Sequence, residues 1–368
     1  MSHKLSCHWN TIQETLFPIL EEKLPVMTEM HQRLATILEF VRVEKFIRFY
    51  HGLVGAPQSD RVAIAHAFIA KKLYNITTTK HLIDRLRCDR VMRQLCGWER
   101  MSDIPSESTF SRAFKDFAIY NLPSKIHAAF IKEHHSSRVI GHISRDSTPI
   151  SVREKAGQKP KEGKPQKEKK KRGRPKKGEK RDEKPVDLSR LDRQLKMSIK
   201  EMLADLPSQC DVGTKADSKG YKMSWRGYKL HIDTADGDIP MSAVLTSAST
   251  HDSQVAIPLA TITKKRINSL YDLMDAAYDA QGIRNHSVSL GHVPLIDFNH
   301  RGPKDIREFL PHEAQRYKER SAAERVNSQL KDNYGGKMIR VRGDKKVFAE
   351  LMFGLLAIAV EQTLRLLT

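Results

Sequence analysis

The segment from Tyr317 to Lys331 carries the residues best suited to phosphate and metal chemistry in this chain. At the helical period of about 100° per residue, Tyr317, Arg320, Glu324 and Lys331 fall within roughly 60° of one another. A carboxylate flanked by two cations and a phenol is suited to binding a metal ion and phosphate groups. The spacing predicts a helix that presents this set, and a surface helix with intrahelical salt bridges is the alternative. The opposite side collects small and apolar residues, which are predicted to pack on a core: Ala322, Ala323, Val326 and Leu330.

Two aspartates upstream of this segment are predicted to stand at the ends of strands. The run from residue 139 to Asp146 alternates like a short strand, and the apolar run from residue 269 to Asp275 predicts another. Asp279 is the alternative to Asp275 as the functional acid. Asp275 is favoured because it directly ends the apolar strand.

Three converging carboxylates make chemical sense only together with divalent cations, because otherwise each raises the pKa of the others. Two Mg²⁺ ions about 3.5–4 Å apart turn such a set into a clamp on the attacking and leaving oxygens of a phosphodiester. We expect Asp146 to bridge both ions, and Asp275 and Glu324 to hold one each. Mn²⁺ is expected to substitute for Mg²⁺. Arg320, Lys331 and Tyr317 are the predicted contacts to the DNA backbone.

The elements around these acids alternate between strands and helices. In order they are the strand ending at Asp146, a helix over 188–203, a loop over 211–222, a hairpin of strands 225–232 and 241–247, a helix over 253–267 capped by Asp252, strand 269–275, helix 280–289, strand 293–298, the Glu324 helix and an apolar helix over 346–367. This order is similar to that of a ribonuclease H-like fold, an α/β domain in which helices flank a mixed sheet. In such a fold the first and fourth strands are neighbours, and the Glu324 helix crosses them.

Residues 1–136 are predicted to form an all-α domain for DNA binding or dimerisation, because apolar residues recur there at helical spacing. Within this region, Ser106 is a candidate N-cap and Arg112 faces away from the apolar stripe behind it. Two interpretations stay open. The helices form either a helix-turn-helix in which Arg112 contacts DNA, or a bundle in which Arg112 is merely solvated. The apolar stripe consists of Phe110, Phe114 and Phe117.

A basic insert over 153–186 interrupts the second domain, which covers 137–368. Between Arg153 and Lys184, 16 Lys or Arg residues face 6 Asp or Glu residues, and the segment contains no aromatic residue. Such a segment cannot bury enough apolar surface to order itself, so we predict a disordered insert. Arg172 and Arg174, in the sequence Arg-Gly-Arg-Pro, resemble an AT-hook that places arginines in the minor groove. The alternative is a solvated linker that binds any phosphate backbone.

Composition indicates a nucleic-acid partner. The net charge of +20 over 368 residues favours a polyanion, while 39% hydrophobic content supports a sizeable core. The four cysteines include no CxxC pair, which argues against a zinc site or a disulfide framework. The apolar run over 351–360 is shorter than the roughly 18 residues of a membrane span. It predicts a buried helix in a soluble protein with no membrane partner.

Three blocks of the sequence resemble those of the DDE transposases of bacterial insertion sequences. They are Asp146-Ser-Thr, Asp275-Ala-Ala-Tyr-Asp, and the Y-x2-R-x3-E-x6-K pattern that runs from Tyr317 to Lys331. The similarity covers roughly residues 100 to 368 and is interrupted by the insert. It implies transposition of the chain's own element by hydrolytic nicking and strand transfer, with no covalent protein–DNA intermediate.

The leading hypothesis is therefore an active transposase that binds terminal inverted repeats and cuts and joins double-stranded DNA with Mg²⁺. Its expected partners are the element ends, the target DNA and a second copy of the chain. Its expected location is the nucleoid in the cytoplasm of a prokaryote. A catalytically silent DNA-binding protein derived from such an element is the second hypothesis. A basic structural nucleic-acid binder is the third.

Overall fold

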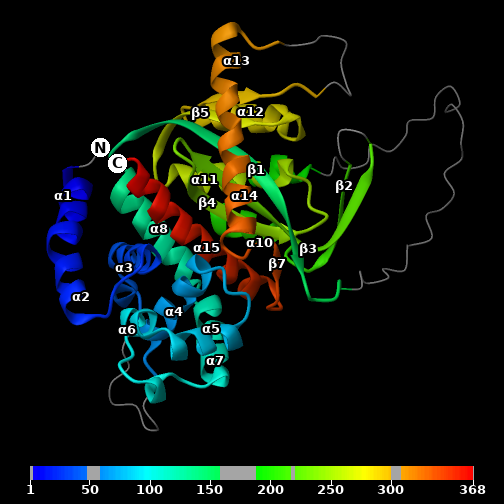
Figure 1. Ribbon diagram of the computed structural model, residues 1–368. Coiled ribbons are helices and arrows are strands. Elements are labelled where there is room, and N and C mark those ends of the chain that lie inside the picture. The colour runs from blue at the N-terminus through cyan, green and yellow to red at the C-terminus, as the bar shows by residue number, and fades with distance from the viewer. Residues whose placement is uncertain (1–2, 48–58, 158–187, 217–219, 300–307, 368) are drawn as a thin grey trace, which may run out of the picture.

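The computed structural model describes residues 3–47, 59–157, 188–216, 220–299 and 308–367. Of the insert predicted to be disordered, 153–186, only residues 153–157 are described. Arg172 and Arg174, the predicted DNA contacts in this insert, lie outside the described residues. The described residues form a mixed sheet flanked by helices, with an all-helical region at the N-terminal end (Figure 1). This architecture is compatible with the predicted fold class.

The sheet has seven strands in the path β2-β3-β1-β5-β6, with β4 and β7 paired beside that path. β2 and β4 occupy successive halves of one edge of β3, while β5 and β7 do the same along one edge of β1. β1 pairs antiparallel with β3 and parallel with β5. The strands are β1 Val139–Val152, β2 Asp211–Ala216, β3 Lys222–Ala235, β4 Ile239–Ser247, β5 Asn268–Met274, β6 Val293–Ile296 and β7 Met338–Ile339.

β1 is longer than predicted, so Asp146 lies within the strand and the prediction that it ends the strand is wrong. Antiparallel β3 continues to pair with β1 as far as Ser151, which keeps the backbone extended beyond Asp146. The parallel partner β5, in contrast, pairs only up to Arg145 opposite Met274. Asp146 and Asp275 therefore directly follow Arg145 and Met274, the last residues that pair between β1 and β5. The predicted adjacency of these two strands is confirmed.

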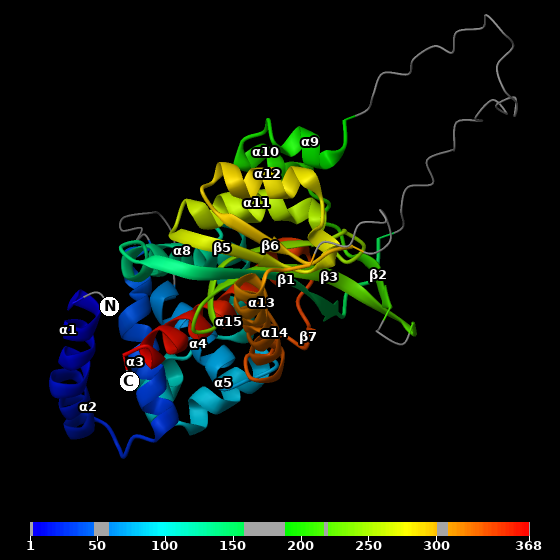
Figure 2. The same ribbon diagram turned by 90° about the horizontal axis from the view of Figure 1, so that it is seen from above.

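Helices cover both faces of the sheet (Figure 2). One face carries α9 Arg190–Gln194, α10 Ile199–Asp205, α11 Ser253–Lys264 and α12 Gln281–Ser289. The other carries α13 Pro311–Tyr317, a 3-10 turn over Lys318–Arg320, α14 Ser321–Asp332 and α15 Asp344–Arg365. The predicted apolar face of the Glu324 helix is confirmed, because its small and apolar residues are buried: Ala322, Ala323, Val326 and Leu330. The prediction of one helix from Tyr317 to Lys331 is wrong, because α14 begins at Ser321 and the 3-10 turn separates it from Tyr317.

Two elements between the insert and β3 differ from the prediction. The helix predicted over 188–203 is two short helices, α9 and α10. The second begins at a capping box in which Ser198 and Glu201 exchange hydrogen bonds, and this start signal separates it from the first. The loop predicted over 211–222 contains strand β2, whose backbone pairs with the first half of β3. Edge pairing of this kind depends on a distant partner, so local composition does not reveal it.

The N-terminal region is helical, as predicted, and it is built around the C-terminal helix α15. Figure 1 shows α15 running among helices from the start of the chain, and it packs on α3, α4, α7, α8 and β4. Because α15 shares the core of the preceding helices, the domain boundary at residue 136 stays a prediction. The helices are α1 His3–Thr11, a π-helical turn Ile12–Leu16, α2 Phe17–Lys23, α3 Glu29–Val41, α4 Arg61–Leu73, α5 Thr79–Cys88, α6 Arg90–Cys96, α7 Glu107–Ile119 and α8 Leu122–His135.

Helix α15 is long and apolar enough to cross a membrane by length and composition alone. In the described structure, 83% of its most apolar window is buried by other elements. Phe353 on α15 stacks on Phe68 of α4, with ring centroids 5.9 Å apart, and also lies beside Phe114 of α7. Packing inside the molecule thus accounts for the apolar character of this helix, as the sequence predicts.

A buried ion pair joins the two central antiparallel strands. Arg145 of β1 donates from Nε and Nη2 to the two carboxylate oxygens of Asp233 on β3, both at 2.8 Å. Thr263 of α11 donates a further hydrogen bond to Asp233 at 2.6 Å. Arg145 is 2% exposed and Asp233 is fully buried. The pair therefore lies in the core directly beside Asp146.

We expect Asp233→Ala to lower the free energy of unfolding by about 3–5 kcal/mol, because it leaves the Arg145 guanidinium buried without a counter-charge. The loss is measured as a fall in the urea midpoint at constant slope. Asp84→Ala is the matched control, since it removes an exposed acid that lies 4.0 Å from Arg87. This control should cost less than about 1 kcal/mol. Equal effects of the two substitutions would contradict a structural role for the Arg145 pair.

Two buried histidines of α8 predict that acid destabilises the fold. His127 bonds the carbonyl of Pro240 at 2.9 Å, and His135 bonds Thr363 Oγ1 of α15 at 2.8 Å. Burial lowers the pKa of each histidine to about 3, and nearby arginines act in the same direction. Below pH about 6.5 the unfolded chain binds protons that the folded chain excludes, so the free energy of unfolding falls by about 1.4 kcal/mol per histidine per pH unit. Urea midpoints between pH 7 and pH 5 measure this slope.

The double variant His127→Gln, His135→Gln should be less stable at pH 7 and should show a shallower loss of stability below pH 6.5. A slope identical to that of the unmodified chain would show that other groups govern the acid sensitivity. The comparison isolates these two side chains because the remaining histidines are unchanged.

Candidate active site

Asp146 and Asp275 form a carboxylate pair at the edge where β5 ends. Asp275 follows β5 and caps a 3-10 turn, its Oδ1 accepting from the Ala277 amide at 3.0 Å. Burial raises the pKa of Asp146 to about 6, and the negative charge of Asp275 acts in the same direction. Burial also raises the pKa of Asp275. The pair is therefore a site at which negative charge is disfavoured until a cation compensates it.

Asp252 is a third buried acid at this site, and its predicted role as a helix cap is wrong. It occupies the N-cap position of α11, but its side chain makes no capping hydrogen bond. Its Oδ1 instead accepts from Ser147 Oγ at 2.8 Å and from Lys229 Nζ at 3.0 Å. Although burial opposes ionisation, His231 and Lys229 hold the pKa of Asp252 below its usual value. Asp252 thus ties the residue after Asp146 to β3.

Glu324 lies on α14 above the same strands, but its carboxylate does not join the aspartate pair. It accepts a hydrogen bond from Arg320 Nη2 at 2.7 Å, and its side chain is 56% exposed. Arg320 lies within the electrostatic reach of Asp146 and Asp275 as well. Among the described residues, no three His, Cys, Asp or Glu side chains come close enough together to hold a metal ion. The structure therefore brings two of the predicted acids together and places Arg320 between them and the third.

Asn327 is a site residue that the sequence analysis missed. It follows Glu324 by three residues on α14, so both side chains lie on neighbouring parts of one helix surface. Its Nδ2 donates to Asp146 Oδ2 at 3.1 Å. Its Oδ1 is buried and has no hydrogen-bond partner in the described part of the chain. The signal that could have revealed Asn327 is its spacing of three residues from Glu324. This spacing places its amide oxygen, which can bind a metal ion, near the predicted metal ligand on the helix surface.

Tyr317 and Lys331 flank the site from the two ends of the predicted face. The Tyr317 hydroxyl donates to the Met274 carbonyl at 3.1 Å, which anchors the backbone just before Asp275. Lys331 is half-buried; burial lowers its pKa, while the charge of Asp146 opposes that shift. Lys331 therefore lies near the aspartate pair, and Tyr317 is already engaged with β5 when no DNA is present.

The remaining predicted residues lie apart from the aspartate pair. Arg112 is on α7 in the helical region, where it is exposed and donates to Thr109 Oγ1 at 3.3 Å. Asp279, the alternative to Asp275, forms an ion pair with Arg284 at 2.8 Å. An acid that already has a guanidinium partner is a poorer candidate for binding a metal ion than one whose pKa is raised.

The residues at this edge fit a divalent oxygen-binding ion. The donor set consists of the Asp146 and Asp275 carboxylates and the unpartnered amide oxygen of Asn327. Mg²⁺ favours one or two carboxylates together with water and substrate phosphate. Burial and the charge of Asp275, which raise the pKa of Asp146, both disfavour its ionised form, and a bound cation would offset them. Asp146 and Asp275 are therefore the side chains best placed to hold such an ion.

Comparison with known families gives two matches. Residues 205–360 match the family described as transposase DDE domain, and this range includes Asp275 and Glu324. Residues 18–116 match a transposase domain (DUF772), which includes Arg112. Asp146 lies between the two matched ranges. No curated protein and no solved structure matches the chain. Both matched families are transposase families, and the two matches together indicate a DDE transposase of insertion sequences.

Proposed function

We propose that the chain binds the terminal inverted repeats of its own element and catalyses metal-dependent cleavage and strand transfer of double-stranded DNA. The observation that carries this proposal is the position of Asp146 and Asp275, which directly follow Arg145 and Met274, the last two residues that pair between β1 and β5. In this proposal, residues 137–368 form a ribonuclease H-like catalytic domain and residues 1–136 a DNA-binding or dimerisation domain. A homodimer in the DNA complex supplies one active site for each element end.

Asp146, Asp275 and Glu324 are the proposed metal ligands, and Mg²⁺ is the proposed ion. When bound, two such ions would activate the attacking oxygen and stabilise the leaving oxygen of the phosphodiester. Glu324 is exposed, so its carboxylate has room to exchange Arg320 for another partner. Arg320 is then available for a DNA phosphate, which it binds in the bidentate geometry that guanidinium groups favour.

Other side chains hold these groups in place. Lys229 and Asp252 fix Ser147 and hence the backbone that carries Asp146. Tyr317 fixes the carbonyl of the residue before Asp275. Lys331 is proposed to bind the DNA backbone near Asp146. Arg112, Arg172 and Arg174 remain predicted DNA contacts.

A catalytically silent DNA-binding protein derived from a transposase is the alternative. It requires no metal site, whereas Asp146 is a buried carboxylate whose ionisation is disfavoured beside Asp275. Burying an acid pair costs folding free energy, so a function such as metal binding is the reason for a chain to keep it. This arrangement favours the active enzyme.

Asp146→Asn should reduce cleavage of element-end DNA by more than about 100-fold, since loss of residues that merely support a metal ligand already costs 10–100-fold. Binding of the same DNA should be retained, because the substitution removes negative charge. Asp279→Asn is the matched control, and it should retain cleavage because Asp279 is paired with Arg284. A gel assay of strand nicking, alongside a binding assay, measures both effects. Cleavage by Asp146→Asn at the unmodified rate would reject the assignment.

Removal of divalent ions with a chelator should abolish cleavage and leave DNA binding measurable, because phosphate contacts depend on the cationic side chains. Adding Mg²⁺ or Mn²⁺ back should restore cleavage in the same assay. A silent DNA-binding protein would instead show no cleavage under either condition. Cleavage that persists in the chelator would show that the carboxylates act without a metal ion.

A further inference from the structure

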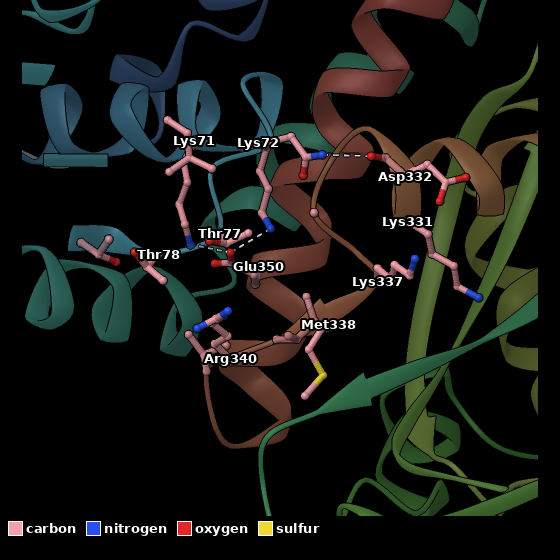
Figure 3. Close-up of a pocket in the computed structure, with 16 residues that line it drawn as sticks. Lys71, Lys72, Thr77, Thr78, Lys331, Asp332, Lys337, Met338, Arg340 and Glu350 are labelled. Carbon is pink, nitrogen blue, oxygen red and sulfur yellow. Dashed lines mark hydrogen bonds and ion pairs between the residues drawn. The ribbon is translucent and has the colours of Figure 1, made fainter. Parts of the chain in front are cut away.

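An open pocket of about 470 Å³ lies between the N-terminal helices and the end of α14 (Figure 3). One wall is formed by the C-terminal end of α4 and by the segment over 76–79 that leads into α5. The facing wall is formed by the end of α14, by residues 337–341 around β7, and by Glu350 of α15. Two parts of the chain that are remote in sequence, 71–79 and 331–350, thus meet here.

The pocket is strongly basic. Its charged lining residues are five cations against two acids, Asp332 and Glu350, which leaves a net formal charge of +3. The two carboxylates are partly committed to structure, because Ser328 Oγ donates to the Asp332 carboxylate at 3.0 Å and the Glu350 carboxylate is buried. A positive pocket of this size attracts a polyanion from solution. The cations are Lys71, Lys72, Lys331, Lys337 and Arg340.

Two of these cations are buried against a single carboxylate. Lys71 and Lys72 both bind Glu350 Oε1, at 2.6 and 2.8 Å, and all three side chains are less than 10% exposed. Despite burial, the two ammonium groups lower the pKa of Glu350 to about 2, so Glu350 is ionised. One carboxylate cannot neutralise two ammonium groups, and burial, which lowers the pKa of Lys72, makes the second positive charge costly unless a further anion offsets it. An excess positive charge in a poorly solvated place calls for a further anion.

The exposed part of the pocket offers groups that bind phosphate. Lys337 and Arg340 are exposed and stand on either side of β7, whose pairing with the end of β1 fixes their positions. The opposite wall presents the N-terminal end of α5, where Thr78 is the N-cap and accepts from the His81 amide at 3.1 Å. The positive end of this helix adds to the field of the cations.

Helix α14 connects the pocket to the active site. Asn327 donates a hydrogen bond to Asp146, and Lys331, one helical turn further along α14, lines the pocket. A strand that passes over Asp146 therefore meets Lys331 next and then the basic pocket.

We propose that this pocket binds backbone phosphates of the DNA strand held in the active site, on the side of the scissile phosphate that faces α5. The proposal rests on the proposed function, and it assigns Lys337 and Arg340 as direct phosphate contacts. Lys71 and Lys72 supply a fixed positive field behind them. The site reads no sequence, because contacts to phosphates position the duplex and contacts to bases specify it.

The test compares two double variants in the Asp146→Asn background, so that DNA binding is measured without cleavage. Lys337→Ala, Arg340→Ala removes the pocket contacts; Lys200→Ala, Lys265→Ala removes two exposed lysines from the opposite face of the sheet. Both change the net charge equally. Fluorescence anisotropy of a labelled duplex, over a range of salt concentrations, gives the affinity and its salt slope.

We expect the pocket variant to bind roughly tenfold more weakly and to lose about 2 from the slope of log affinity against log salt, one for each phosphate contact. The control variant should keep the slope. Equal losses in the two variants would overturn the proposal, because they would reflect net charge alone. Failure of cleavage in the unmodified chain would sink the proposed function and leave this comparison intact.

Neutral methylphosphonate linkages then locate the contact along the strand. Replacing single phosphates beside the cleavage position should weaken binding by the unmodified pocket and have no further effect on the Lys337→Ala, Arg340→Ala variant. Inorganic phosphate should compete only weakly, because one anion cannot span the pocket and the active site. If the two proteins respond identically at every position, the pocket does not touch the DNA backbone.

Discussion

The position of the active-site acids depends on the buried ion pair between Arg145 and Asp233. A guanidinium in the core has few ways to satisfy its N–H donors. Those of Arg145 bond both carboxylate oxygens of Asp233 on β3 and the thioether of Met274 on β5. This network locks β1 in register with both neighbours one residue before Asp146. A slip of one residue would turn Arg145 out of the core and Asp146 away from its present face. The costly burial of a charge thus fixes the register at the one place where the chemistry needs it.

The site built on this register is electrostatically incomplete. Burial and the charge of Asp275 raise the pKa of Asp146, and burial and the charge of Asp252 raise the pKa of Asp275, while Asp252 is paired with Lys229, and Glu324 with Arg320. Among the described side chains, the acids thus divide into two that form no ion pair and two that form one. Only the first kind gains much from an added cation. The exposed Glu324–Arg320 pair is weak, since surface ion pairs contribute at most about 1 kcal/mol. Its exchange for a metal ion and a phosphate therefore costs little.

Local sequence patterns predicted most of this arrangement, and most of the errors share one cause. The period of the Glu324 helix and the apolar run before Asp275 are local signals, and both predictions agree with the structure. The length of β1, the pairing of β2 and the turned side chain of Asp252 depend on partners far along the chain, such as β3 and Lys229. No local pattern contains that information. Asn327 was missed because one polar residue on a helix carries no periodic signal, although its spacing from Glu324 pointed toward the site.

Helix α15 connects the N-terminal helices to the basic pocket through a single side chain. Glu350 extends from the core of these helices to the pocket, where it holds Lys71 and Lys72 beside the loop that follows α14. On α14 itself, Asn327 bonds Asp146, and Lys331, one turn later, lines the pocket. A phosphate in the pocket would therefore contact the helical region and the α14 surface at once. It would stabilise their present arrangement because it would bind this arrangement more tightly than one in which the two surfaces are apart. DNA that fills the pocket would thus favour the geometry in which α14 covers Asp146, so that binding along the strand and assembly of the active site become one equilibrium.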